Sequence, residues 1–336
     1  MATLANTYLN LIDVHKQADP AIGEVIEVLK RQNPILDDAV AMECNMGAIH
    51  RHAIRTGLPT PAWGRLYQGI PQSKSTVQQV DDTTGFLEAR SGIDTRLLKL
   101  AKNPGALRLG EAMSHLEAMN QEMASGLFYH DTATTPERFK GLAARFSTLG
   151  GGGAGNQIVD GGGVGSANTS IWFVTWGDHA CHLLYPQGTK AGVSREDKGE
   201  QRITDASGNP FYVKEEVFTW HMGLAVKDWR YVVRIANIDV AAMNAGNVDL
   251  YRLMRRAYWL LQSRRMDAKS SRIAIYANRD VLAALDGLST GIPGGTGNNT
   301  FLQIRPMELE GKEVLTYRGM PIRETDALLN TEARVV

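Results

Sequence analysis

The feature that most constrains the fold of this 336-residue chain is one long amphipathic helix predicted over residues 103–129. Asn103 can cap its N-terminus and Pro104 suits its first turn. Apolar side chains recur at spacings of three and four: Leu109, Met113, Leu116, Met119, Met123 and Leu127. About 25 residues would span roughly 37 Å at 1.5 Å per residue. We interpret the methionines as core-facing gap fillers rather than as a soft-metal or promiscuous binding surface.

Strand-prone segments and a second helix follow. Residues 171–239 contain several β-prone runs separated by turn signals, and residues 248–265 predict a helix with an apolar side and many arginines elsewhere. Its basic face could contact a polyanion or be a solvated face paired to acids, and both interpretations stay open. Residues 271–288 and 311–329 then predict a strand, an Asn turn, a helix and a returning strand pair. These predicted elements contain no recognisable set of active-site residues, which is typical of a structural protein.

Residues 46–92 predict a long two-stranded excursion. Glycines and prolines cluster in its middle, and β-prone residues flank them. The same middle carries four large apolar side chains that a solvated tip would not normally expose together: Trp63, Leu66, Tyr67 and Ile70. Such a tip is expected to contact a neighbour.

The N-terminal 45 residues contain a second amphipathic signal. Asp19 can cap a helix and Pro20 suits its first position. The apolar stripe consists of Ile22, Val25, Ile26 and Leu29. This segment is either an arm that needs a surface to lie on or an ordinary surface helix of its own domain.

Composition excludes several classes of function. Lys plus Arg equal Asp plus Glu, 36 each, which removes the electrostatic argument for a dedicated nucleic-acid or anionic-membrane binder. Two cysteines, Cys44 and Cys181, are too few to staple the chain and indicate a reducing cytosol. No apolar run reaches about 18 residues, and the N-terminus does not resemble a signal peptide. We therefore expect a soluble, untargeted protein.

Candidate chemistry is sparse. In a strand, His179 and Cys181 would share one face while His182 pointed to the other, which is too few ligands for zinc. His50 and His52 would also share a face, without a third ligand that the sequence identifies. The glycine-rich residues 150–170 do not end in Gly-Lys-Ser/Thr, so a mobile connector is favoured over a phosphate cradle.

No nucleophile or metalloprotease motif is present, and the acidic pairs Asp81-Asp82 and Glu215-Glu216 are interpreted as solvated. The sequence therefore predicts no catalytic, cofactor-binding or metal-binding residues and no cofactor. It predicts a protein that is not an enzyme.

The order of parts resembles the major capsid proteins of tailed bacteriophages with the Hong Kong 97-type fold, particularly the short-tailed phage group. The segments that carry the resemblance are, in order, 56–80, 183–213, 232–239, 272–286 and 317–326. The resemblance covers nearly the whole chain. It implies an α+β fold that consists of an N-terminal arm, an extended β-hairpin loop, a peripheral domain with a long spine helix, and an axial domain.

The resemblance also implies approximate domain boundaries. Residues 1–45 would be the arm, 46–92 the extended loop, and 93–240 the peripheral domain with its spine helix at 104–129. Residues 241–336 would be mainly the axial domain, with a return to the peripheral domain. The excursion begins near residue 46, which leaves no room for the long N-terminal scaffolding segment of some family members, so we expect Met1 or Ala2 to start the mature subunit.

The implied function is self-assembly into an icosahedral head that encloses phage double-stranded DNA. The implied partners are copies of the chain in pentamers and hexamers, a portal protein, separate scaffolding and decoration proteins, and non-specific contacts with packaged DNA. The protein would be located in the virion after assembly in the bacterial host cytoplasm. Two alternatives stay open: an encapsulin-like compartment shell, and a metal- or nucleotide-dependent enzyme.

Overall fold

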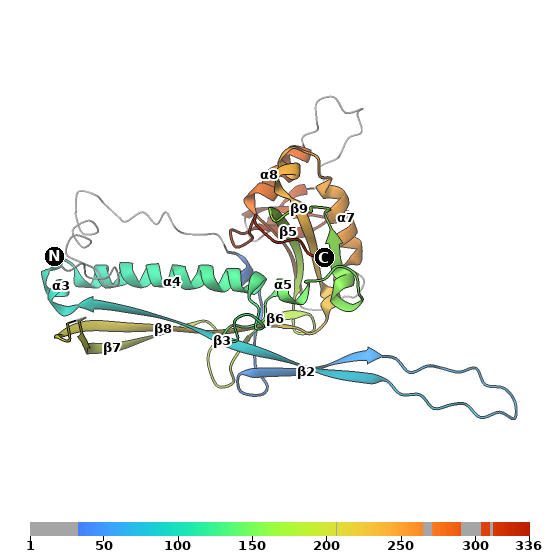
Figure 1. Ribbon diagram of the computed structural model, residues 1–336, viewed down its shortest axis with the longest axis horizontal. Helices are drawn as coiled ribbons and strands as arrows, with labels where there is room; N and C mark the ends of the chain where they lie inside the picture. Colours follow the sequence, from blue (N-terminus) through green and yellow to red (C-terminus); the bar gives the residue numbers. More distant parts are fainter. Residues whose placement is uncertain (1–32, 206, 265–270, 290–303, 310–311) are drawn as a thin grey trace.

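The computed structural model describes residues 33–205, 207–264, 271–289, 304–309 and 312–336. An elongated part, an upright body and a projecting hairpin make up the chain (Figure 1). The amphipathic helix predicted from Asp19 lies outside the described residues. No described helix is both long and apolar enough to span a membrane.

Within the described residues, the strands join into one mixed 13-stranded sheet whose main path runs β11-β12-β13-β10-β5-β6-β8-β3-β2. The hairpin and the elongated part contain β2 (Ile49–Gly57), β3 (Thr76–Asp94), β6 (Cys181–Tyr185), β7 (Val193–Thr204) and β8 (Pro210–Val226). The body contains β4 (Ile158–Asp160), β5 (Asn168–Trp176), β9 (Val232–Asp239), β10 (Arg272–Ala277), β11 (Ile304–Leu309), β12 (Lys312–Tyr317) and β13 (Met320–Glu324). A short strand, β1 (Ala41–Glu43), pairs with β6.

The helices lie on both parts of this sheet. The longer ones are α4 (Pro104–Tyr129), α7 (Leu250–Leu260) and α8 (Arg279–Ser289). The shorter ones are α2 (Ile35–Asp38), α3 (Thr95–Leu100), α5 (Leu142–Arg145) and α6 (Val240–Asn244), with single 3-10 turns η1 (Gly153–Gln157), η2 (Trp229–Tyr231) and η3 (Gln262–Arg264). The mixed α and β architecture predicted from the sequence is confirmed.

Strand β3 connects the projecting hairpin to the elongated part. Its first residues pair antiparallel with β2, from Thr76 to Thr83. From Thr84 to Asp94 it pairs antiparallel with β8. Its 19 residues would extend over roughly 60 Å at about 3.3 Å per residue. The hairpin is therefore a continuation of the sheet and not a separate loop.

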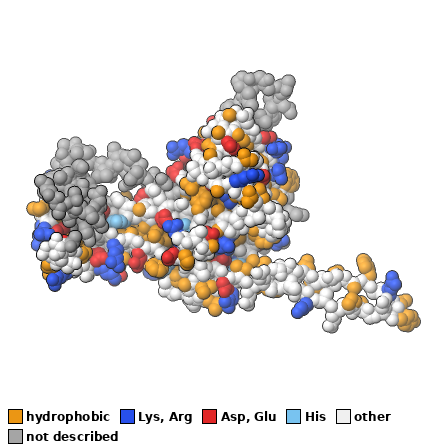
Figure 2. Space-filling model, viewed as in Figure 1, with side chains coloured by type: hydrophobic (Ala, Val, Ile, Leu, Met, Phe, Trp, Pro, Cys, Tyr) orange, Lys and Arg blue, Asp and Glu red, His pale blue; other side chains and the backbone are white. Residues whose placement is uncertain are grey.

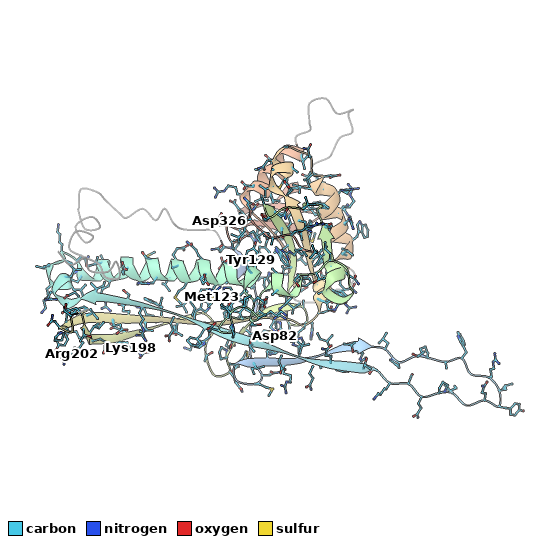
Figure 3. The ribbon with its side chains drawn as sticks, viewed as in Figure 1. Asp82, Met123, Tyr129, Lys198, Arg202 and Asp326 are labelled. Atoms are coloured by element: carbon cyan, nitrogen blue, oxygen red, sulfur yellow. The ribbon has the colours of Figure 1, made fainter. Side chains whose placement is uncertain are left out.

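Helix α4 begins and ends close to its predicted limits. The Asn103 side chain accepts a hydrogen bond from the backbone N–H of Ala106, which confirms the predicted cap. Met119 and Met123 are buried, as predicted, and Figure 3 shows Met123 in the half of the helix nearer the body. The prediction is wrong for the first part of the stripe, because Leu109, Met113 and Leu116 are exposed.

Two large hydrophobic clusters stabilise the chain. The first joins the C-terminal half of α4 to the inner faces of β5, β6, β8 and β10, and includes Phe128, Trp172 and Tyr276. The second lies in the body, where α7 and α8 cover β5, β9 and β10. Because fully burying one large apolar side chain is worth roughly 1.5–3 kcal/mol, these clusters dominate the stability of the chain.

A buried ion pair fastens α4 to the body. Arg234 donates to Glu332 at 2.9 Å and to the carbonyl of Phe146 at 2.8 Å. Tyr129, at the end of α4, donates its hydroxyl to the same carboxylate at 2.5 Å. Burial and the adjacent Glu332 carboxylate raise the pKa of the Tyr129 hydroxyl, so it stays a donor. The Tyr129 hydroxyl thereby connects the C-terminal end of α4 to the body.

Part of the glycine-rich segment, which was predicted to be a mobile connector, forms regular secondary structure. Residues 153–157 form a 3-10 turn and residues 158–160 form β4, which pairs with β9. A Cβ on Gly161 would lie 2.7 Å from the carbonyl oxygen of Asn237, and one on Gly155 would lie 1.9 Å from that of Gly150. The glycines are required because backbones approach each other closely here.

Candidate assembly interface

The tip of the β2–β3 hairpin exposes the apolar side chains that the sequence singled out. Residues 58–75 connect the two strands and project far from the body (Figure 1). Trp63 is 101%, Leu66 91% and Tyr67 107% exposed, and Ile70 is also exposed. Figure 2 shows apolar side chains at the far end of the hairpin, away from any core. A monomer gains nothing from this arrangement, which is typical of an interaction site.

Tyr67 also holds a strained backbone conformation. Its φ is 66°, in the left-handed region, and the N–H of Gln68 donates to the carbonyl of Arg65 to close the turn. For a residue with a Cβ, this conformation costs roughly 1–2 kcal/mol. A glycine would avoid that cost, so the tip carries an aromatic side chain at a position where it destabilises the isolated subunit.

The shaft of the hairpin is held by paired strands and by one exposed ion pair. Eight residues of β2 pair with β3, with a register shift between Arg55 and Gly57. Across this ladder, Arg51 binds both carboxylate oxygens of Asp81 at 2.7 Å. This pairing lowers the pKa of the Asp81 carboxyl. A two-stranded ribbon without packing partners is only marginally stable by itself, so its orientation depends on its root.

The root is fixed by a buried ion pair around Asp82. Arg145 of α5 donates to Asp82 Oδ1 at 2.6 Å and to the carbonyl oxygen of Leu224 in β8 at 2.8 Å. Figure 3 shows Asp82 at the crossing where β3 leaves the elongated part. A Cβ on the nearby Gly85 would lie 2.9 Å from the carbonyl oxygen of Glu137. The hairpin is therefore joined to α5 and β8 by contacts that tolerate little displacement.

A cluster of three histidines is buried beside Asp82. His50 and His52 lie on one face of β2, as predicted, and His182 comes from β6. The rings of His50 and His182 are 5.5 Å apart, and those of His50 and His52 are 6.1 Å apart. Burial lowers the pKa of all three, that of His182 to about 4. The histidines are neutral in the folded subunit at pH 7.

His179 and Cys181, the other candidate metal ligands in the sequence, do not share a strand face. His179 lies in the turn before β6 and not in a strand, so the predicted shared face with Cys181 is wrong. Cys181 is fully buried in the core, and burial raises its pKa. Throughout the described ranges, no three His, Cys, Asp or Glu side chains are placed to hold a metal ion. The sequence could not identify His182 as a neighbour of His50, because their proximity depends on which strands pair.

A second buried carboxylate connects α4 to the strands below it. Glu216 of β8 is buried and pairs with Arg108 of α4 and with Arg195 of β7, the latter at 2.8 Å. Arg108 also binds Asp197 at 2.9 Å. The interpretation of Asp82 and Glu216 as solvated is therefore wrong. Asp81, next to Asp82, is exposed, and Glu215, next to Glu216, is half-buried. Alternation along each strand turns Asp82 and Glu216 inward, where arginines neutralise them.

Helix α7 confirms its predicted basic face. Asp249 caps the helix, and Leu250, Leu253 and Met254 are buried against the body. The opposite face exposes Arg252, Arg255 and Arg256 together with Trp259. Among the described residues, no acidic side chain lies within salt-bridge distance of these three arginines. Within the part of the chain that the structure describes, this face therefore lacks the acidic partners that one of the two interpretations expected.

Comparisons with known proteins agree with this geometry. A family model described as "Major capsid protein GP7" matches residues 17–336. A chain of the bacteriophage Epsilon15 structure is 29% identical, with a TM-score of 0.77, and the match covers 100% of this chain and 99% of that one. The bacteriophage JBD30 capsid shares the fold at 9% identity and a TM-score of 0.51, covering 97% of this chain and 96% of that one. A search of curated proteins finds no match.

Proposed function

This chain belongs to the GP7 family of major capsid proteins and forms capsid shells, and we propose that its hairpin tip is the contact that joins neighbouring subunits. The observation that carries this proposal is the group of exposed apolar side chains at the end of a paired shaft. An isolated subunit cannot bury these side chains, whereas a closed lattice of copies can. The buried Asp82–Arg145 pair sets the direction in which the tip reaches.

The four implied domains give each part a role. Residues 1–45 act as an arm and 46–92 as the extended loop that reaches over a neighbour. Residues 93–240 form the peripheral domain around α4, and 241–336 form mainly the axial domain around fivefold and sixfold axes. Both hydrophobic clusters contain side chains from 93–240 and from 241–336, so these two parts of the chain share their cores.

The finished shell is an icosahedral head of pentamers and hexamers that encloses double-stranded DNA in the virion. It is assembled in the bacterial cytoplasm with a portal protein and with separate scaffolding and decoration proteins. Contacts with DNA are non-specific, and the balanced composition of 36 basic and 36 acidic residues is consistent with a wall that is not a dedicated DNA binder. The subunit performs no catalysis.

Deletion of residues 57–72 tests the role of the tip. We expect a folded subunit, because this segment contributes no buried side chain, and we expect no stable shells in electron micrographs. Shells that form as readily as those of the unmodified chain would remove the tip from the mechanism. The contents of purified shells separate a phage head, which holds DNA, from an encapsulin-like compartment, which holds a cargo protein.

A further inference from the structure

The exposed face of α7 and the adjacent turn between β12 and β13 carry a group of arginines. The turn residue Arg318 is exposed, and its guanidinium lies 4.7 Å from the centre of the Tyr258 ring in α7. Trp259 of the same helix is 57% exposed. The basic group consists of Arg252, Arg255, Arg256 and Arg318. Because like charges one turn apart repel each other, a partner with negative charge would be bound favourably here.

An acidic group lies at the end of β13. This strand ends at Glu324, and Asp326 follows it. Their carboxylates lie 3.1 and 3.9 Å from guanidinium nitrogens of Arg279, at the start of α8. The next residue of α8, Asp280, is exposed. The acidic group (Glu324, Asp326 and Asp280) therefore has three carboxylates for one guanidinium, which leaves a surplus of negative charge at this site.

The two groups lie on different sides of the body. Arg318 precedes β13 and Glu324 ends it, so roughly 20 Å of extended chain separates them at about 3.3 Å per residue. Figure 1 shows α7 on the right of the body, the side toward which the hairpin projects, and Figure 3 shows Asp326 on the left. Complementary patches on different sides of one subunit fit a head-to-tail contact between copies, which closes into rings.

The composition of the chain favours a second copy over DNA as the partner of the basic group. A protein that binds a polyanion typically has a surplus of basic residues. A head-to-tail contact between copies instead needs both signs of charge on one chain. Here 36 basic residues balance 36 acidic ones.

We propose that the basic group of one subunit binds the acidic group of the next subunit around a pentamer or hexamer. Trp259, beside the arginines, adds apolar area to this contact. The inference rests on the assembly of copies proposed above. It adds a second contact to that of the hairpin tip, on the same side of the subunit.

Charge reversal in the full chain, with the hairpin tip intact, tests this pairing. Arg255→Glu with Arg256→Glu should raise the lowest subunit concentration that gives shells about tenfold or more, because like charges then meet across the contact. Glu324→Arg with Asp326→Arg should have the same effect. The four substitutions together should return this concentration to within about threefold of that of the unmodified chain, because the two groups interact directly.

Arg202→Glu is the matched control. Arg202 is an exposed arginine of β7, at the end of the elongated part away from the body (Figure 3). We expect this variant to assemble like the unmodified chain. The urea midpoint of each free subunit should stay unchanged, because the substituted side chains form at most surface ion pairs.

Two results would overturn the proposal. The first is loss of assembly in both reversal variants without recovery when the four substitutions are combined. The second is normal assembly of Arg255→Glu with Arg256→Glu; if this variant also loses affinity for a short duplex DNA in fluorescence anisotropy, the basic group contacts packaged DNA instead. A failure of the tip contact is recognised separately, because deletion of residues 57–72 would then leave assembly intact.

Discussion

Replacing Trp63 by alanine should weaken the shell without weakening the subunit. The side chain is 101% exposed and presents about 200 Å² of largely apolar surface. Complete burial against a neighbour would contribute about 5 kcal/mol at roughly 25 cal/mol per Å². Ordering the side chain costs about 1 kcal/mol, and coverage at a contact is incomplete. We therefore expect Trp63→Ala to cost about 2–4 kcal/mol per contact, the range of an aromatic hot spot.

The assay compares dissociation of assembled shells with unfolding of free subunits. A loss of 2–4 kcal/mol lowers the association constant of each contact by about 30- to 700-fold. Light scattering in increasing urea should therefore show Trp63→Ala shells dissociating at a lower concentration than unmodified shells. The free subunit should unfold within about 0.5 kcal/mol of the unmodified one, because the residue makes no buried contact.

Gln72→Ala is the matched control, since Gln72 is a polar and exposed residue of the same tip. We expect its shells to dissociate like those of the unmodified chain. The reasoning is refuted if Trp63→Ala shells are as resistant to urea as Gln72→Ala shells.

Three further predictions concern the stability of the subunit, measured by urea unfolding. Asp82→Asn should cost about 3–5 kcal/mol, because it leaves the Arg145 guanidinium buried without its partner, whereas Asp81→Asn at the exposed pair should change little. Burial lowers the pKa of His182 from 6.5 to about 4, so the unfolded chain binds more protons than the folded chain between these two values. The free energy of unfolding should therefore be highest above about pH 6.5 and fall as the pH is lowered towards 4. The fall should be shallower in His182→Gln. Gly161→Ala should destabilise by about 1–3 kcal/mol because its Cβ meets a carbonyl oxygen, whereas Gly110→Ala, with open space, should stabilise by about 0.5–1 kcal/mol.

The sequence was most informative where local rules decide the structure. The cap at Asn103, the start of α4 at Pro104 and the apolar tip around Trp63 depend on residues close together in the chain. The shared strand face of His50 and His52 follows from the two-residue period alone.

The sequence could not show contacts between residues far apart in the chain, because these depend on which strands pair and on which part of a helix the body covers. His182 joins His50 because β6 and the hairpin meet beside the same core, 132 positions apart in the chain. Asp82, which was interpreted as solvated, is buried and paired with Arg145, 63 positions further along the chain. Leu109 and Met123 share one periodic pattern, yet only Met123 lies under the body. The periodic pattern predicts the side of the helix on which a residue projects. Whether that side chain is buried depends on the tertiary fold.

A density map of assembled shells tests the central claim most directly. If the hairpin tip joins subunits, Trp63 and Tyr67 will lie against an adjacent subunit at every equivalent position and be largely buried. A map in which both side chains remain in solvent in all subunits would contradict this account.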